Sequence, residues 1–255
     1  MRNIKLIIEY DGACFNGWQT QCLTRGNPQT AGKRLKTVQG EIEKAAKKLF
    51  GKKISLIGAS RTDSGVHAKE QTANFRVDSK LPLYNIKNGL NSYLGRRISI
   101  IFAEEVPLKF HSRTDSTGKL YRYTIVNRKS RSPLFEKYSA FVPYDLNITA
   151  MKKAATYLIG KKDFKSFQAS DKKEKYSIRT VKKIEIVSRP PIMEIYIQAD
   201  GFLYNMARNI VGTLIEVGRG RFKPERVKEI LEKKHRPLAG RTAQAQGLCL
   251  EKVFY

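Results

Sequence analysis

Residues 54–77 read ISLIGASRTDSGVHAKEQTANFRV and hold two strand patterns joined by a short polar loop. Ile54 to Gly58 is mostly apolar and ends at a glycine, which is typical of a short buried strand. From Ala73 to Val77 apolar and polar residues alternate, which is the period of a half-buried strand. Short loops between strands favour antiparallel pairing, so this stretch predicts a sheet of that kind.

The rest of the chain mixes helices and strands without the strict alternation of a doubly wound fold. Strand patterns occur at 4–10, 98–102, 121–125, 193–197 and 247–255, and helix patterns at 37–50, 84–94, 148–158, 206–217 and after Pro224. The expected fold class is therefore α+β with mainly antiparallel sheets. We expect an N-terminal α/β domain at 1–107 and a C-terminal α/β domain at 108–255.

The chain is strongly basic. Its 49 Lys and Arg oppose 23 Asp and Glu, which gives a formal net charge of +26. Because these charges are spread along the sequence, they predict a broad electropositive surface that attracts nucleic acid. No signal peptide, membrane-spanning run or lipidation motif is expected, and no helix-turn-helix or zinc-finger pattern favours DNA. RNA is the favoured partner, and the expected location is the cytoplasm.

The three cysteines, Cys14, Cys22 and Cys249, form no CxxC pair. A structural zinc site or a disulfide framework is therefore not expected, and a reducing compartment fits. Cys14 could in principle act as a thiol nucleophile with His67 or His111. A small buried hydrophobic residue is the favoured interpretation, because free cysteine is among the most buried residue types.

The loop SRTDSGVHA at 60–68 carries an arginine, a carboxylate and an imidazole. Considered alone, Asp63 in Asp-Ser-Gly is more simply a turn residue than a catalytic one. Arg61 beside it would keep the carboxylate ionised, as a nucleophile requires. His67 could be a base, although a structural role that caps the loop is favoured. The lack of a second carboxylate argues against a glycosidase or a two-metal nuclease.

Two further candidates lie in the second half. Tyr121 and Tyr123 are most simply core residues of a sheet, but an aromatic at a sheet surface can stack on a base extruded from RNA. Arg208 lies on an apolar helix, where an arginine is either a solvated charge or the buried partner of a carboxylate. The residues alone leave both questions open.

Eight stretches, in order, resemble the TruA family of tRNA pseudouridine synthases over nearly the whole chain. They are YDGACFNGWQTQ, TVQGEIEKA, SRTDSGVHA, FHSRTDSTGKLYRYTI, DFKSF, IRTV, DGFLYNMARNIVGTLIEVGRG and TAQAQGLCLEKVFY. The resemblance implies isomerisation of uridine to pseudouridine in the anticodon stem-loop of tRNA, without a cofactor or a metal. It also implies a homodimer whose subunits have two RNA-binding-like domains with a basic cleft between them.

The resemblance also assigns roles to residues. Asp63 matches the nucleophile, and Arg61 matches the arginine that helps to flip the nucleotide. Tyr121 matches the aromatic that stacks on the target base and is a proposed base for a ribose proton. Arg208 matches the basic partner of the catalytic carboxylate, and His67, in the same block as Asp63, is expected to contribute to substrate binding.

Some positions depart from the family pattern. Ser60 stands where glycine is usual, Ser112 replaces a common alanine, and Lys162 replaces a common histidine. The segment from Cys22 to Lys36 is basic and longer than the usual connection, so it could change which RNA is bound. The alternatives are a paralogue acting on ribosomal or another RNA and, less favoured because Asp63 and its partners are present, a non-catalytic RNA-binding module.

Overall fold

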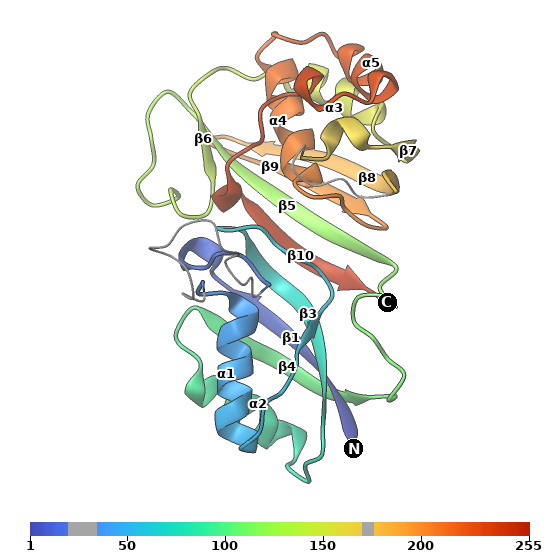
Figure 1. Ribbon diagram of the computed structural model, residues 1–255. Helices are drawn as coiled ribbons and strands as arrows, with labels where there is room; N and C mark the ends of the chain where they lie inside the picture. Colours follow the sequence, from blue (N-terminus) through green and yellow to red (C-terminus); the bar gives the residue numbers. More distant parts are fainter. Residues whose placement is uncertain (20–34, 170–175) are drawn as a thin grey trace, which may run out of the picture. The chain divides into compact units, whose positions relative to one another are not determined.

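The computed structural model describes residues 1–19, 35–169 and 176–255, and Figure 1 shows their arrangement as a ribbon. The basic segment predicted to alter RNA choice lies, from Cys22 to residue 34, outside the described residues. The chain is α+β with mostly antiparallel pairing, so the predicted fold class is confirmed. Within the described part of the chain, no helix is long and apolar enough to cross a membrane.

Two compact units make up the structure. The N-terminal unit comprises Met1–Ser116, Leu250–Val253 and Tyr255, and the C-terminal unit comprises Thr117–Cys249 and Phe254. The first unit thus extends past residue 107, because the side chains of Asn3 and Asn74 bind the backbone of the following segment. Asn3 Nδ2 donates to the Phe110 carbonyl over 2.9 Å, and Asn74 Oδ1 accepts the Ser112 N–H over 2.9 Å. The domain boundary at 107 stays a prediction.

The N-terminal unit is a sheet with two helices. Its strands follow the order β4-β1-β3-β10, with the short β2 paired to β3, and β1 is antiparallel to both β3 and β4. The bounds are β1 Arg2–Tyr10, α1 Val38–Phe50, β2 Ile57–Gly58, β3 His67–Val77, α2 Leu83–Tyr93, β4 Ile98–Val106 and β10 Leu248–Phe254. The side chains of Ile4, Leu6 and Ile8 are fully buried, which accounts for the strand period seen in the sequence.

Helix α1 begins and ends as the sequence predicts. The Thr37 hydroxyl accepts the N–H of Gly40 over 3.2 Å, and Gly51 ends the helix in the left-handed conformation at φ 69°. Glu41 in the first turn and Lys47 and Lys48 in the last turn suit the helix dipole. This helix also explains why β2 is shorter than the predicted strand 54–58. The side chains of Gln39 and Glu43 bind the backbone of Leu56 and replace a strand partner there.

The C-terminal unit contributes the strands β5-β9-β8-β7, in that order, with β6 parallel to β5. Figure 1 shows helices α3, α4 and α5 in the same half of the chain. The bounds are β5 Gly118–Asn127, β6 Ala140–Val142, α3 Ile148–Thr156, β7 Gly160–Asp163, β8 Ile178–Arg189, β9 Ile192–Ala199, α4 Met206–Gly218 and α5 Arg226–Lys233. Strands β6, β7 and β8 were not among the predicted elements.

Candidate active site

The Asp63 loop connects β2 to β3 and contains a tight turn. The Val66 N–H donates to the Asp63 carbonyl over 3.2 Å, and Gly65 has φ 79°. A positive φ at the third turn position is what a type II turn requires, so glycine is favoured there. The expected bend at Ser64-Gly65 is therefore present, and it sets the direction in which the loop carries Asp63.

The loop that follows β1 braces the Asp63 loop from one side. The Trp18 N–H donates to the Thr62 carbonyl over 3.1 Å, and the Gly65 N–H and the Ser64 hydroxyl both donate to the Phe15 carbonyl. The Tyr10 hydroxyl lies 2.8 Å from the Thr62 hydroxyl in the buried interior. Because the residues on both sides of Asp63 are held, the backbone that carries this carboxylate is fixed in place.

Two glycines permit this close packing. A Cβ atom on Gly12 would lie 1.9 Å from the Val66 carbonyl oxygen, and one on Gly17 would lie 2.6 Å from the Thr62 carbonyl oxygen. Gly17 also has φ 83°. A side chain at either position would push the two loops apart, so the spacing of glycines in YDGACFNGW follows from their contact.

His67 is buried at the start of β3. Its Nδ1 accepts the backbone N–H of Gly12 over 3.0 Å, while Asp11 Oδ1 lies 3.3 Å from the same nitrogen. The Gly12 contact is shorter, and Asp11 Oδ1 already accepts the Ala13 N–H, so we assign Nδ1 as an acceptor. Asp11 also pairs with Arg97. This agrees with the favoured structural role of His67, and its expected part in substrate binding stays a prediction.

Ser60 lies at the base of the loop, where its backbone is fully paired. Its N–H donates to Gln71 Oε1 over 3.3 Å, and its carbonyl accepts from Gln71 Nε2 over 2.8 Å. Gln71 is completely buried in β3. The amide of one side chain thus fixes the position at which the family usually has glycine.

Arg61 is exposed on the loop. Among the residues that the structure describes, it forms no ion pair with a carboxylate, so its predicted action on Asp63 is not carried by a direct contact. Its charge acts instead on Arg113, a second arginine of the same unit. Arg113 was not a candidate in the sequence, although it occupies the same place in a second Ser-Arg-Thr-Asp-Ser stretch at 112–116.

The expectation that Cys14 is buried is wrong. Its side chain is exposed at the end of the short helical turn Gly12–Cys14, in which Gly12 is the buried residue. The backbone of Gly12, rather than the cysteine, makes the close contact with the Asp63 loop. Across the described ranges, no group of three or more His, Cys, Asp or Glu side chains is placed to hold a metal ion.

Tyr121 belongs to the C-terminal unit and lies on the buried face of β5. It is 5% exposed and meets Phe202 edge-on with ring centroids 4.9 Å apart. Tyr123, on the same face, is fully buried and donates its hydroxyl to the Gln244 carbonyl over 2.8 Å. Burial raises the pKa of the Tyr123 phenol, and the nearby Arg208 charge opposes that shift. Both rings therefore have core contacts, and stacking of Tyr121 on a base stays a prediction.

Arg208 is half-buried near the start of α4 and is held by the protein. Its Nε donates to the Ala243 carbonyl over 2.7 Å, and Nη1 donates to Asn205 Oδ1 over 2.9 Å. The Ala243 N–H donates back to the Arg208 carbonyl over 3.2 Å. The interpretation of Arg208 as a freely solvated charge is thus excluded. The segment at 240–244 that holds it was not predicted.

That segment packs directly on helix α4. A Cβ atom on Gly212 would lie 1.7 Å from the Arg241 carbonyl oxygen, so only glycine allows the approach. The buried Asn209 side chain accepts from Arg236 and Thr242 and donates to the Phe167 carbonyl. Gly212 in RNIVG therefore allows the segment that enters TAQAQ to lie against α4, and the Ala243 carbonyl of that segment binds Arg208.

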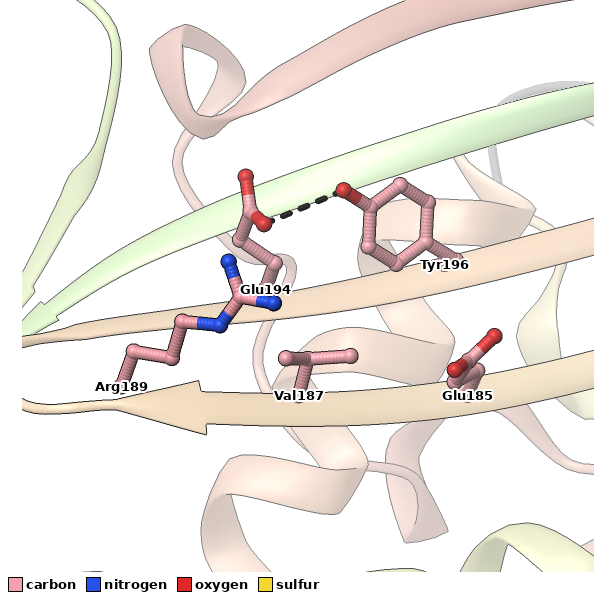
Figure 2. Close-up of a pocket in the computed structure, with 5 residues that line it drawn as sticks. All are labelled: Glu185, Val187, Arg189, Glu194 and Tyr196. Carbon is pink, nitrogen blue, oxygen red and sulfur yellow. Dashed lines mark hydrogen bonds between the residues drawn. The ribbon is translucent and has the colours of Figure 1, made fainter.

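A shallow pocket of about 290 Å³ lies on β8 and β9, lined by Glu185, Val187, Arg189, Glu194 and Tyr196. Figure 2 shows the Tyr196 hydroxyl donating to Glu194, over 3.0 Å. Glu194 also pairs with Arg122, the neighbour of Tyr121 in β5. Because neighbouring strand residues point to opposite faces, this pocket lies on the sheet face opposite Tyr121. It contains none of the predicted site residues.

The candidate residues thus fall into two groups. Arg61, Asp63 and His67 lie within one loop and strand start of the N-terminal unit, whereas Tyr121 and Arg208 lie in the C-terminal unit. Within that second unit, Arg208 is close enough to Tyr123 to affect its pKa. Each group is rigidly supported by its own unit, and every predicted residue is in the described part of the chain.

Comparison with known proteins gives matches along the full length. The sequence profile of a family described as tRNA pseudouridine synthase matches residues 7–115 and 154–255. The "tRNA pseudouridine synthase A 2" of Clostridium perfringens is 48% identical over 255 residues, with 100% of both chains covered. The "tRNA pseudouridine synthase A" proteins of Clostridium acetobutylicum and Thermoanaerobacter sp. are each 45% identical over 255 residues, again with 100% of both chains covered.

Proposed function

The chain belongs to the tRNA pseudouridine synthase family, and we propose that it converts uridine to pseudouridine in the anticodon stem-loop of tRNA. The observation that carries this proposal is the 48% identity over the whole length to a protein named for that activity. In the reaction the bond from the ribose to N1 of uracil breaks and a bond to C5 forms, while the proton on C5 is exchanged for one on N1. The base is an isomer of the original, so the atoms balance without a co-reactant.

Asp63 is the proposed nucleophile. It lies in a loop whose flanking residues, Thr62 and Gly65, are both held by backbone hydrogen bonds to the loop after β1. A fixed carboxylate can attack the sugar or base carbon of an extruded uridine with little loss of orientation. Arg61 is proposed to help flip the nucleotide, and His67 supports the loop that presents the carboxylate.

Tyr121 and Arg208 are the proposed partners from the C-terminal unit. The Tyr121 ring would stack on the flipped uracil, and its hydroxyl is a proposed base for a ribose proton. Arg208 would keep the nucleophilic carboxylate ionised. The support for these roles is the match of both residues to the family blocks, together with the hydrogen bonds that fix the Arg208 guanidinium at Asn205 and Ala243.

The proposal extends to assembly and location. We propose a cytoplasmic homodimer in which two RNA-binding-like domains enclose a basic cleft for the tRNA. The formal charge of +26 supports binding to a polyanion, because each neutralised phosphate releases condensed counterions. Sedimentation of the purified chain with and without tRNA would test the dimer, and a monomer in both conditions would contradict it.

Pseudouridine mapping of total RNA from cells with and without the gene tests the substrate. Loss of the modification in tRNA anticodon arms is the expected result. Loss confined to ribosomal RNA would instead favour the alternative paralogue, which the long basic segment from Cys22 to Lys36 motivates. No loss in any RNA, combined with retained RNA binding by the purified protein, would favour a non-catalytic module.

A further inference from the structure

The stretch Ser-Arg-Thr-Asp-Ser occurs at 60–64 and again at 112–116. Its second copy follows β4 and is anchored where the first copy begins. The Ser112 hydroxyl donates to the carbonyl of Ile57 in β2 over 2.5 Å, and the Ser112 N–H donates to Asn74 Oδ1. The Tyr255 hydroxyl donates to the Ser112 carbonyl over 2.7 Å. The second copy is thus fixed beside the strand that leads into the Asp63 loop.

Arg113 is held at the same place by its own side chain. Its Nε donates over 3.3 Å to the carbonyl of Gly58, the last residue of β2. Burial lowers the pKa of Arg113, and the charge of Arg61 lowers it further. The Arg113 guanidinium is therefore bonded at Gly58, three residues before Arg61, and the charges of the two arginines oppose one another.

Neither arginine has a carboxylate partner within residues 1–19, 35–169 and 176–255. The carboxylate nearest in sequence to Arg113 is already used, since Asp115 Oδ2 accepts the His111 N–H over 3.0 Å and Oδ1 accepts the Thr114 hydroxyl over 3.1 Å. A pair of like charges without a counter-charge is stabilised by an anion. Guanidinium groups match the geometry of a phosphate, to which they donate two parallel hydrogen bonds.

We propose that Arg61 and Arg113 together bind one phosphodiester of the RNA backbone beside the target uridine. This inference rests on the proposed function, because it places the phosphate next to the proposed nucleophile Asp63. It adds Arg113 as a substrate-binding residue. Because the Gly58 carbonyl holds its side chain, Arg113 orients the RNA backbone, while Arg61 also acts on the nucleotide to be flipped. The ligand chemistry is that of a phosphate anion held by two guanidinium groups.

The salt dependence of tRNA binding tests this site. Arg113→Gln is expected to raise the Kd for tRNA about tenfold at low salt, the effect of losing one charge-assisted contact. It should also reduce the slope of log Kd against log salt, by at most about one, because the phosphate is then neutralised by Arg61 alone. The control is Arg96→Gln, which removes an exposed arginine of the same unit between α2 and β4 and should leave the slope unchanged.

A double variant distinguishes one shared phosphate from two separate contacts. If Arg61 and Arg113 bind the same phosphodiester, Arg61→Gln combined with Arg113→Gln should lower the slope by about one in total. A fall of about two, with the two losses of affinity multiplying, would overturn the shared site. An unchanged slope in Arg113→Gln would overturn any phosphate contact by Arg113.

Two further measurements separate a phosphodiester contact from a structural role of Arg113 and from binding of a free anion. Arg113→Lys keeps the charge and should restore most of the slope. If Arg113→Gln lowers kcat at saturating tRNA but not the slope, Arg113 acts on the loop through Gly58 and the proposal falls. Inorganic phosphate could instead protect the wild-type protein, but not Arg113→Gln, from thermal unfolding. That result, together with an unchanged salt slope for tRNA binding, would assign the site to a free anion.

Binding and turnover are read separately in these experiments. A wild-type protein that shows the expected slope but forms no pseudouridine would contradict the proposed function and keep the phosphate site. Normal turnover with an unchanged slope in Arg113→Gln would contradict the phosphate site alone.

Discussion

The backbone N–H of Gly12 donates to Nδ1 of His67 over 3.0 Å and joins the loop after β1 to the first residue of β3. Both residues are buried, and Nδ1 is the acceptor of this hydrogen bond. The turn that carries Asp63 spans residues 63–66 and immediately precedes His67. His67 thus holds the start of β3 against the loop after β1.

Two replacements of His67 should distinguish the effect of its hydrogen-bond acceptor from the effect of its side-chain size. In His67→Asn the amide oxygen can take the position of Nδ1, so most stability and turnover should remain. In His67→Leu the buried Gly12 N–H loses its acceptor, and the free energy of unfolding should fall by about 1–3 kcal/mol. Urea unfolding of both variants measures this difference, and equal stability would show that the bond has little effect.

The repeated Ser-Arg-Thr-Asp-Ser stretch provides a matched pair for the proposed nucleophile. Asp63→Asn should abolish pseudouridine formation and leave the Kd for tRNA nearly unchanged, because an amide is too poor a nucleophile. Asp115→Asn changes the same residue type in the same five-residue context and should retain turnover. Turnover near the wild-type rate in Asp63→Asn would remove this residue from its proposed role.

Two glycines with positive φ should respond differently to the same change. Gly51→Ala, at φ 69° with no atom within 4 Å of the new Cβ, should cost about 1–2 kcal/mol of backbone strain and leave turnover unchanged. Gly17→Ala adds a Cβ 2.6 Å from the Thr62 carbonyl oxygen, so it should cost more and also lower kcat. Thermal unfolding and single-turnover assays of the two variants compare these effects, and equal losses would contradict the contact.

The two tyrosines of β5 should also behave differently. Tyr123→Phe removes the hydroxyl that binds the Gln244 carbonyl, which should destabilise the fold by about 1 kcal/mol without changing turnover. Tyr121→Phe keeps the ring for stacking but removes the proposed base, so kcat should fall while KM stays near the wild-type value. An unaltered kcat in Tyr121→Phe would assign the ribose proton to another group.

Acid should weaken the C-terminal unit through Asp163. Burial raises the pKa of this carboxyl, but hydrogen bonds from Ser177, Lys234 and the Lys165 N–H outweigh burial and hold it below the usual value. Because the folded pKa is lowered, the stabilisation is present above the ordinary aspartate pKa and is lost as the pH falls through the lowered one. Urea unfolding at several pH values should show that Asp163→Asn removes this dependence.

The sequence predicts best where one local pattern decides the structure. The alternation in β1, the cap at Thr37 and the bend at Ser64-Gly65 are all set by residues within a few positions of one another. Strand β8 was missed because its period is broken. Its register against β9 shifts between Val181 and Lys183, so consecutive lysines interrupt the alternation of apolar residues.

Support for the candidate site was less predictable, because it depends on contacts between distant segments. The bonds from Gly12 to His67, from Arg113 to Gly58 and from Arg208 to Ala243 each join backbone to a side chain far along the chain. Such bonds leave no periodic trace in the sequence. The glycines at 12 and 212 were the available signals, since each allows a close backbone approach.

Strand β10 supplies Leu250–Val253 to the N-terminal unit and lies beside β3 in its sheet. Tyr255 adds its hydroxyl bond to Ser112, and Lys5 lies over the Tyr255 ring at 4.9 Å. During synthesis, the first 116 residues therefore emerge from the ribosome without one strand of their own sheet. Translation that stops before β10 therefore yields an N-terminal unit whose sheet lacks this strand beside β3.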